Sequence, residues 1–105
     1  MGLFQKLFGG TKQQRLEDFT ARGAVVLDVR SRGEYDSGAI PGAKNIPLQQ
    51  VSSKIETIKK WNKPVITCCA SGMRSGKAAK LLRQVGLEAH NGGAWQSVER
   101  ARQEK

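Results

Sequence analysis

The sequence VITCCASGMRSGK, residues 65–77, decides the fold of this chain. Its β-branched residues predict a buried strand that ends at a cysteine, and small residues then lead into a helix with an arginine in its first turn. The backbone N–H groups of such a loop and of a helix N-terminus converge on one centre and attract negative charge. A cysteine placed there ionises readily, because helix N-termini and nearby arginines lower its pKa from about 8.5 into a range of roughly 3.5–7.5. We therefore expect an anion-binding loop around a nucleophilic thiolate.

The two adjacent cysteines allow two counts to Arg74. From Cys68 the spacing is C-x5-R, which is similar to the wider loop of cysteine-dependent phosphatases. From Cys69 it is C-x4-R, a tighter loop, and C-x-x-G-x-R-S resembles the active-site loop of the rhodanese family. Tyrosine-specific phosphatases usually carry histidine directly before their cysteine, whereas Thr67 and Cys68 stand there in this chain. We therefore take Cys69 as the nucleophile and keep a phosphatase that uses Cys68 as the lesser alternative.

Strand geometry separates the two thiols. Side chains alternate along a strand, so we expect Cys68 to point into the core as a small hydrophobe and Cys69 to face the loop. The loop's backbone N–H groups and one guanidinium would bind the negative charge of a substrate, with hydroxyl groups adding hydrogen bonds. The candidate substrate-binding residues are Ala70, Ser71, Gly72, Met73, Arg74 and Ser75.

A second apolar run, AVVLDV at residues 24–29, is typical of a strand buried on both faces of a parallel sheet. Asp28 and Arg30 then lie at the carboxyl end of that strand, where ligands bind in such sheets. We expect both residues to support the site. A capping-box pattern in the short helix that follows accounts for Glu34 and Asp36 without a catalytic role.

The remaining segments alternate between helix and strand, which predicts an α/β domain with a small, mostly parallel central sheet and helices on both faces. At 105 residues we expect one domain over residues 13–105, preceded by a flexible or docked segment over residues 1–12. The further expected elements are helices over 13–22, 48–61, 75–85 and from Trp95 onward, strands over 44–47 and 87–91, and a turn at Gly92 and Gly93.

The resemblance to the rhodanese family extends beyond the loop. The pattern L-D-V-R-S-x-x-E-Y-x-x-G-x-I-P-G-A-x-N-I-P, which begins at Leu27, is similar to the first half of a rhodanese domain. Together with the loop and the later glycine pair, it covers most of residues 24–98. The family commonly has histidine where this chain has Ala39, a position associated with the framework more than with sulfur transfer. His90, the only histidine, is expected to be structural.

The resemblance implies a single-domain rhodanese-like sulfurtransferase. The Cys69 thiolate would take a sulfane sulfur from thiosulfate or a similar small anionic donor as a persulfide, and would pass it to a thiol, a protein acceptor or cyanide. The alternative is a sulfur carrier or persulfide-binding module that turns over small donors poorly. The resemblance implies neither a metal nor an organic cofactor.

The composition limits the kinds of binding partner that we expect for this chain. The net charge of +9 favours an anionic substrate, but the basic residues are scattered and aromatic residues are few, so we expect no nucleic-acid partner. Two neighbouring cysteines provide no disulfide framework and no metal-ligand spacing, which predicts a cytoplasmic protein, expected to be a monomer. The segment MGLFQKLFGG, residues 1–10, has too short an apolar run for a signal peptide, and a membrane role is not expected.

Overall fold

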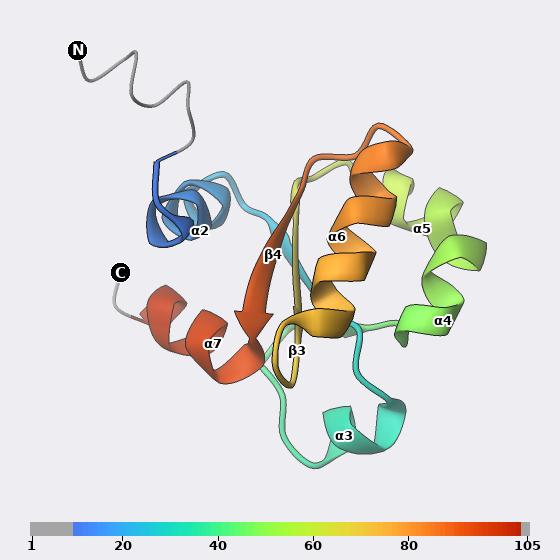
Figure 1. The fold of residues 1–105 in the computed structure, drawn as a ribbon, viewed down its shortest axis with the longest axis horizontal. Helices are drawn as coiled ribbons and strands as arrows, with labels where there is room; N and C mark the ends of the chain where they lie inside the picture. The colour runs from blue at the N-terminus through green and yellow to red at the C-terminus, as the bar shows by residue number, and fades with distance from the viewer. Residues whose placement is uncertain (1–9, 104–105) are drawn as a thin grey trace.

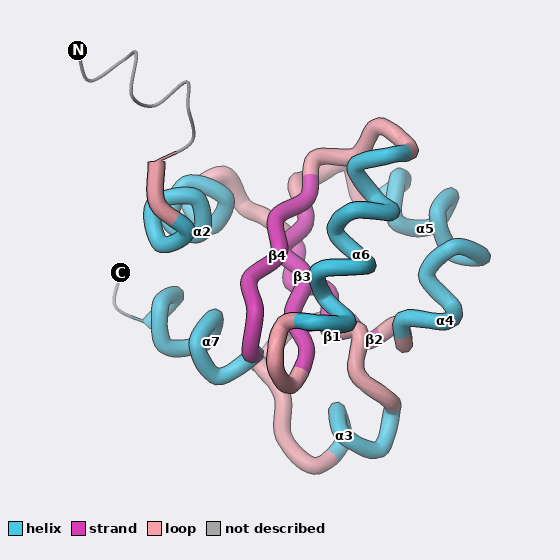
Figure 2. The backbone as a smooth tube through the Cα atoms, viewed as in Figure 1, coloured by secondary structure: helices cyan, strands magenta, loops and turns pink. Residues whose placement is uncertain are grey.

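The strand predicted from the central sequence, β3 (Val65–Cys69), is buried along its whole length. In this computed structural model, which describes residues 10–103, β3 pairs with β1 (Val25–Asp28) on one side and with β4 (Ala89–Ala94) on the other. The short strand β2 (Lys44–Asn45) pairs with β1, so the order is β2-β1-β3-β4 (Figure 2). All three pairings are parallel. The predicted α/β class and parallel sheet are confirmed.

Helices cover both faces of this sheet (Figure 1). On one face lie α4 (Leu48–Val51), η1 (Ser52–Lys54), α5 (Ile55–Lys60) and α6 (Met73–Gln84); on the other lie α2 (Lys12–Ala21) and α7 (Trp95–Gln103). The helix α3 (Arg32–Asp36) follows the carboxyl end of β1.

Each layer of helices closes a hydrophobic core against one face of the sheet. Cys69 and Leu82 belong to the core beneath α6, whereas Cys68 and Val98 belong to the core beneath α2 and α7. All four side chains are fully buried. The alternation predicted for the end of β3 is therefore confirmed, because adjacent cysteines lie in different cores.

Two helices begin at capping boxes that their sequences specify. Thr11 and Gln14 cap α2, and Ser31 and Glu34 cap α3, with the side chain of each residue accepting from the backbone N–H of the other. The predicted cap of the α3 segment is confirmed. Gly23, at φ +78°, takes the left-handed conformation that ends α2 and leads into β1.

Helix α6 begins earlier than its hydrophobic pattern predicts. Its first residue is Met73 and not Ser75, because Gly72 takes φ 101° directly before it and turns the chain into the helix. Met73 and Arg74 consequently stand in the first helical turn. The single helix or pair of turns expected over 48–61 is divided into α4, η1 and α5.

The predicted turn at Gly92 and Gly93 is wrong, since both residues belong to β4. A Cβ atom on Gly92 would lie 2.6 Å from Cγ2 of Val98 and 2.9 Å from Cγ2 of Ile66. Glycine is therefore needed at residue 92 for the close approach of α7 and β3 to β4, whereas Gly93, at φ +86°, lies where the pairing of β3 with β4 shifts register.

Residues 10–103 contain no helix that is both long enough and apolar enough to cross a bilayer. Residues 1–9 lie outside the described part of the chain, so the expectation of a flexible or docked amino-terminal segment stays a prediction.

Gly92→Ala should lower the free energy of unfolding by about 1–3 kcal/mol, because the added methyl group overpacks a site with no room for it. Denaturant unfolding measures the change. Gly33→Ala is the matched control: a Cβ there would have no neighbour within 4 Å, and the expected change is less than about 1 kcal/mol. Equal losses in both variants would contradict the packing account.

Candidate active site

The loop after β3 closes over the sulfur of Cys69. Sγ accepts a hydrogen bond from the Gly72 N–H at 3.0 Å and from the Ser75 N–H at 3.4 Å, and the Ser75 Oγ lies 3.3 Å away. The left-handed φ of Gly72 turns the chain into α6 directly after the first of these N–H groups, and this turn brings the Ser75 N–H to the same sulfur. The strand, the loop and the first turn of α6 therefore form a cradle of donors around one thiol.

These donors decide the acidity of Cys69. Burial by itself raises the pKa of the thiol, whereas hydrogen bonds from the Ser75 side chain and from the N–H groups of Ser75, Gly72 and Ser71 lower it. The lowering prevails, so the pKa lies below that of an ordinary cysteine. Hydrogen bonds to a charged acceptor are stronger than those to a neutral one, which favours the thiolate.

The sulfur of Cys69 lies just beneath the surface. The residue has no exposed area, but Ala70 and Ser71 above it are exposed, and Met73 keeps 73% of its surface in water. A second sulfur atom bound to Cys69 would add a bond of about 2 Å. Because Cys69 has no exposed area, we expect small reagents to reach its sulfur more readily than bulky ones.

Cys68 has the opposite environment. It is fully buried on the other face of the sheet, opposite Asp28 in the register of β1 and β3. Burial, followed by the negative charge of Asp28, raises the pKa of this thiol to about 12. Cys68 is therefore a neutral core residue at physiological pH.

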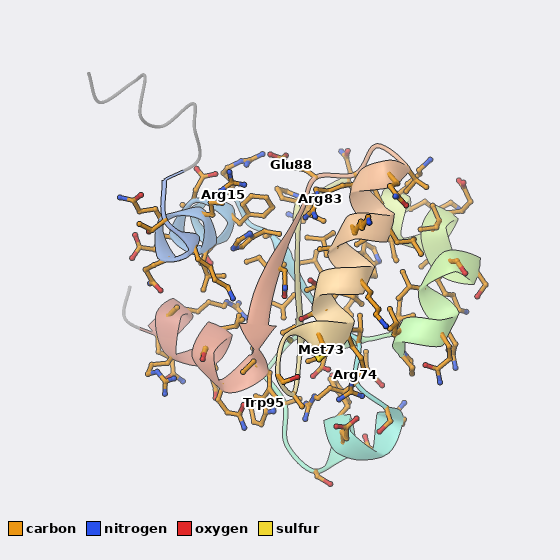
Figure 3. All side chains as sticks on the ribbon, viewed as in Figure 1. Arg15, Met73, Arg74, Arg83, Glu88 and Trp95 are labelled. Atoms are coloured by element: carbon orange, nitrogen blue, oxygen red, sulfur yellow. The ribbon has the colours of Figure 1, made fainter. Side chains whose placement is uncertain are left out.

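Arg74 points from the start of α6 toward α3, as Figure 3 shows. Its two terminal nitrogen atoms donate to the two carboxylate oxygens of Glu34, at 2.8 and 3.0 Å. These hydrogen bonds with Arg74 hold the pKa of Glu34 near 2. The sequence explained Glu34 by its capping box alone and did not predict this ion pair, which joins residues 40 positions apart.

Asp28 and Arg30 lie at the carboxyl end of β1, as predicted, but make no recorded hydrogen bond to the Cys69 loop within residues 10–103. Arg30 Nη2 donates to Asp28 Oδ2 at 2.7 Å and to the carbonyl of Gly38 at 2.7 Å, and its Nη1 donates to the carbonyl of Glu34 at 3.3 Å. Its guanidinium also lies 4.9 Å from the ring centroid of Trp95. The buried pair thus anchors α3, the helix that carries the partner of the loop arginine.

Asn91 of β4 is the member of the site that sequence reasoning missed. Its Oδ1 accepts from the Ser75 hydroxyl at 2.7 Å, and its Nδ2 donates to the carbonyl of Gly72 at 3.2 Å. The available signal was weak: asparagine is uncommon in strands, and this one stands directly before the glycine pair. Its partners are known only once β4 is placed beside α6.

His90 lies on the face of β4 away from Cys69. Its ring centroid is 5.6 Å from that of Phe19 in α2, consistent with the structural role expected for it. In the described part of the chain, no three histidine, cysteine or acidic side chains are grouped as a metal site would require.

A thiol that accepts hydrogen bonds from backbone N–H groups, at the carboxyl end of a parallel strand, lies where negative charge is favoured. The model of the rhodanese-like domain matches residues 12–96. The chain therefore belongs to the rhodanese family.

Individual relatives agree with this placement. Protein YqhL of Bacillus subtilis is 43% identical over 72 residues, covering 67% of this chain and 56% of YqhL. Thiosulfate sulfurtransferase GlpE of Pseudoalteromonas translucida is 30% identical over 90 residues, covering 81% of this chain and 85% of GlpE. The solved structure described as rhodanese with anions from E. coli is 31% identical with a TM-score of 0.66, covering 71% of this chain and 91% of that one.

The chain thus spans about half the length of YqhL and most of GlpE. These comparisons support sulfur transfer as the general class of activity.

At neutral pH, limiting iodoacetamide should label wild type on Cys69 only, because the pKa of this thiol is lowered and that of Cys68 is about 12. Cys68→Ser should keep the fast reaction and Cys69→Ser should lose it, as peptide mass mapping would show. As the pH is lowered, the rate of Cys69 alkylation should begin to decline at a lower pH than the rate of an ordinary cysteine does. Comparable labelling of both cysteines would contradict the separation of the two thiols.

Proposed function

We propose that the protein is a sulfurtransferase that carries one sulfur atom at a time as a persulfide on Cys69. The observation that carries the proposal is the convergence of the Gly72 and Ser75 N–H groups on Sγ, at 3.0 and 3.4 Å. The same donors that favour a thiolate would hold the negative sulfur of a persulfide. The named relatives support the class of reaction but not the donor.

In the first step, the Cys69 thiolate attacks the outer sulfur of thiosulfate or a similar small anionic donor. A bond forms between Sγ and that sulfur, the bond within the donor breaks, and the rest of the donor, which is sulfite in the case of thiosulfate, leaves with the bonding electron pair. The negative charge of the attacking thiolate passes to the terminal sulfur of the persulfide. Backbone donors of residues 70–75 would remain within reach of it.

In the second step, a thiolate or cyanide attacks the terminal sulfur. The new bond forms to the acceptor, the bond to Sγ breaks, and Cys69 regains its electron pair as a thiolate. The fixed donors that stabilise its charge make the Cys69 thiolate a good leaving group, and they also raise the fraction of Cys69 that is ionised and able to attack. This is covalent catalysis in two stages, with the sulfur held on the protein between them.

The supporting residues act at a distance. Asp28 fixes Arg30, and Arg30 holds the carbonyl groups of Glu34 and Gly38 in the α3 segment. Glu34 in turn fixes the guanidinium of Arg74 beside the loop. We propose that this chain of contacts keeps the loop donors aimed at Cys69, while Arg74 adds positive potential for the donor anion.

A sulfur carrier is the second candidate, and the ion pair of Arg74 favours it. Both terminal nitrogen atoms of this guanidinium bind Glu34, which leaves less positive charge for a small dianion. A carrier of this kind would accept sulfur from a protein partner and turn over thiosulfate poorly. A phosphatase that uses Cys68 has little support, because this thiol is buried on the other face with a pKa of about 12.

Initial rates with thiosulfate and cyanide distinguish these functions. The sulfurtransferase should turn over many times, with the parallel double-reciprocal plots of a ping-pong mechanism. Cys69→Ser should be inactive, and Cys68→Ser should keep most activity while losing some stability. Loading without turnover would favour the carrier, and aryl-phosphate hydrolysis that survives in Cys69→Ser would favour the phosphatase.

Arg74→Ala should raise the KM for thiosulfate roughly fivefold, the equivalent of about 1 kcal/mol, because the half-exposed guanidinium is screened by solvent. It should also move the acidic limb of the kcat/KM profile to higher pH, since loss of the positive charge raises the pKa of Cys69. Lys80→Ala, an exposed position on the same helix, is the charge-matched control. Unchanged kinetics in Arg74→Ala would remove this residue from the mechanism.

A further inference from the structure

A chain of side-chain hydrogen bonds leads from Cys69 into β4. Sγ lies 3.3 Å from the Ser75 Oγ, and this hydroxyl donates to Oδ1 of Asn91 at 2.7 Å. The same Oδ1 accepts from the Gly93 N–H at 2.9 Å, and Nδ2 donates to the Gly72 carbonyl at 3.2 Å. The Asn91 amide is thus bonded both to the loop and to the hydroxyl beside the sulfur.

Backbone partners fix the orientation of this amide. If it were flipped, its NH2 group would face the Gly93 N–H and its oxygen would face the Gly72 carbonyl, so that two like groups would meet at each end. Only the observed orientation satisfies both backbone groups. An acceptor therefore always faces the Ser75 hydroxyl from the side of β4.

The Ser75 hydroxyl has one proton and stands between two groups that can accept it. While Cys69 is a neutral thiol, its S–H can donate to Oγ and the hydroxyl can donate to Asn91, so every group is satisfied. When Cys69 becomes a thiolate, both neighbours of the hydroxyl are acceptors. The proton can then turn to the charged sulfur, which gives up the bond to Oδ1, while Oδ1 keeps its bond from the Gly93 N–H.

We propose that Asn91 is a positioning residue that holds the Ser75 hydroxyl proton while Sγ is neutral and releases it when Sγ becomes a thiolate. The inference rests on the proposed function, in which Sγ alternates between these two states. In the persulfide the negative charge lies on the terminal sulfur, so the hydroxyl returns to Asn91. When the acceptor removes that sulfur, the hydroxyl turns again and stabilises the thiolate that leaves.

The test is a double-mutant cycle on the pKa of Cys69, measured from the pH dependence of its alkylation by iodoacetamide. Asn91→Ala, Ser75→Ala and the double variant are compared with the parent, all carrying Cys68→Ser so that one thiol reacts. Arg74 of α6 is the charged group that acts on Cys69 from its own loop, and Glu34 faces it from α3; both are unchanged throughout the cycle. Loosening of the loop by Asn91→Ala appears in both backgrounds and cancels.

With Ser75 present, Asn91→Ala frees the hydroxyl for the thiolate. The change in the Cys69 pKa that Asn91→Ala causes should therefore be more negative with Ser75 present than in the Ser75→Ala background, by about half a unit to one unit. Equal effects in the two backgrounds, or a difference of the opposite sign, would overturn the proposal, because a residue that only packs the loop does not act through the hydroxyl.

Asn91→Asp decides the question if Asn91→Ala does not retain the native circular dichroism spectrum. The carboxylate has the shape of the amide and is a stronger acceptor, so it should hold the proton away from the sulfur. The rise in the Cys69 pKa should then be larger with Ser75 present than in the Ser75→Ala background. An equal rise in both backgrounds would overturn the proposal, because the added negative charge alone would then explain it.

Alkylation does not require sulfur transfer. A coupled cycle in a protein that forms no persulfide would contradict the proposed function and leave the role of Asn91 intact. Equal effects of Asn91→Ala in the two backgrounds of a protein that does form the persulfide would overturn the role of Asn91 and leave the proposed function intact.

Discussion

The site depends on backbone N–H groups that converge on the sulfur of Cys69. They can do so because Gly72 takes a left-handed conformation and the first turn of α6 follows at once, bringing the Ser75 N–H to the same atom. A β-carbon on Gly72 would be strained at φ 101° and would lie 3.4 Å from the Cα of Gly93. The acidity of one thiol is thus built from backbone geometry, which the packing of α6 against β3 and β4 holds in place.

A second layer of polar contacts holds this geometry from the side of α3. The pair of Asp28 and Arg30 is buried, and a buried ion pair is worth keeping only when its remaining donors find partners. Arg30 finds them in carbonyl groups of the α3 segment, so the pair fixes a helix that has few buried contacts of its own. Glu34 on that helix then orients Arg74. The position of the Arg74 guanidinium beside the loop therefore depends on residues of β1 and α3 as well as on α6.

Much of this arrangement follows from short-range patterns. The run over residues 24–29, the strand before Cys69 and the capping box of Ser31 predicted two strands of the sheet, their direction and the start of α3. Alternation along β3 was enough to separate the two cysteines. These predictions succeed because they depend on neighbours in the sequence.

Apart from the early start of α6 and the division of residues 48–61 into α4, η1 and α5, the failures involve contacts between distant segments. Gly92 and Gly93 were placed in a turn because glycine commonly marks one, whereas here Gly92 permits close packing against β3 and α7. The bonds of Asn91 to Ser75, and of Glu34 to Arg74, join elements whose relative position no local pattern records. Polar partners in a site of this kind become visible only when the sheet order is known.

The central claim is that Cys69 carries the transferred sulfur. Intact-protein mass after brief exposure to thiosulfate, with and without later cyanide, tests it most directly in wild type and Cys69→Ser. The account predicts a gain of one sulfur atom in wild type, its removal by cyanide, and no gain in the variant. A gain that persists in Cys69→Ser, or no gain in either protein, would contradict it.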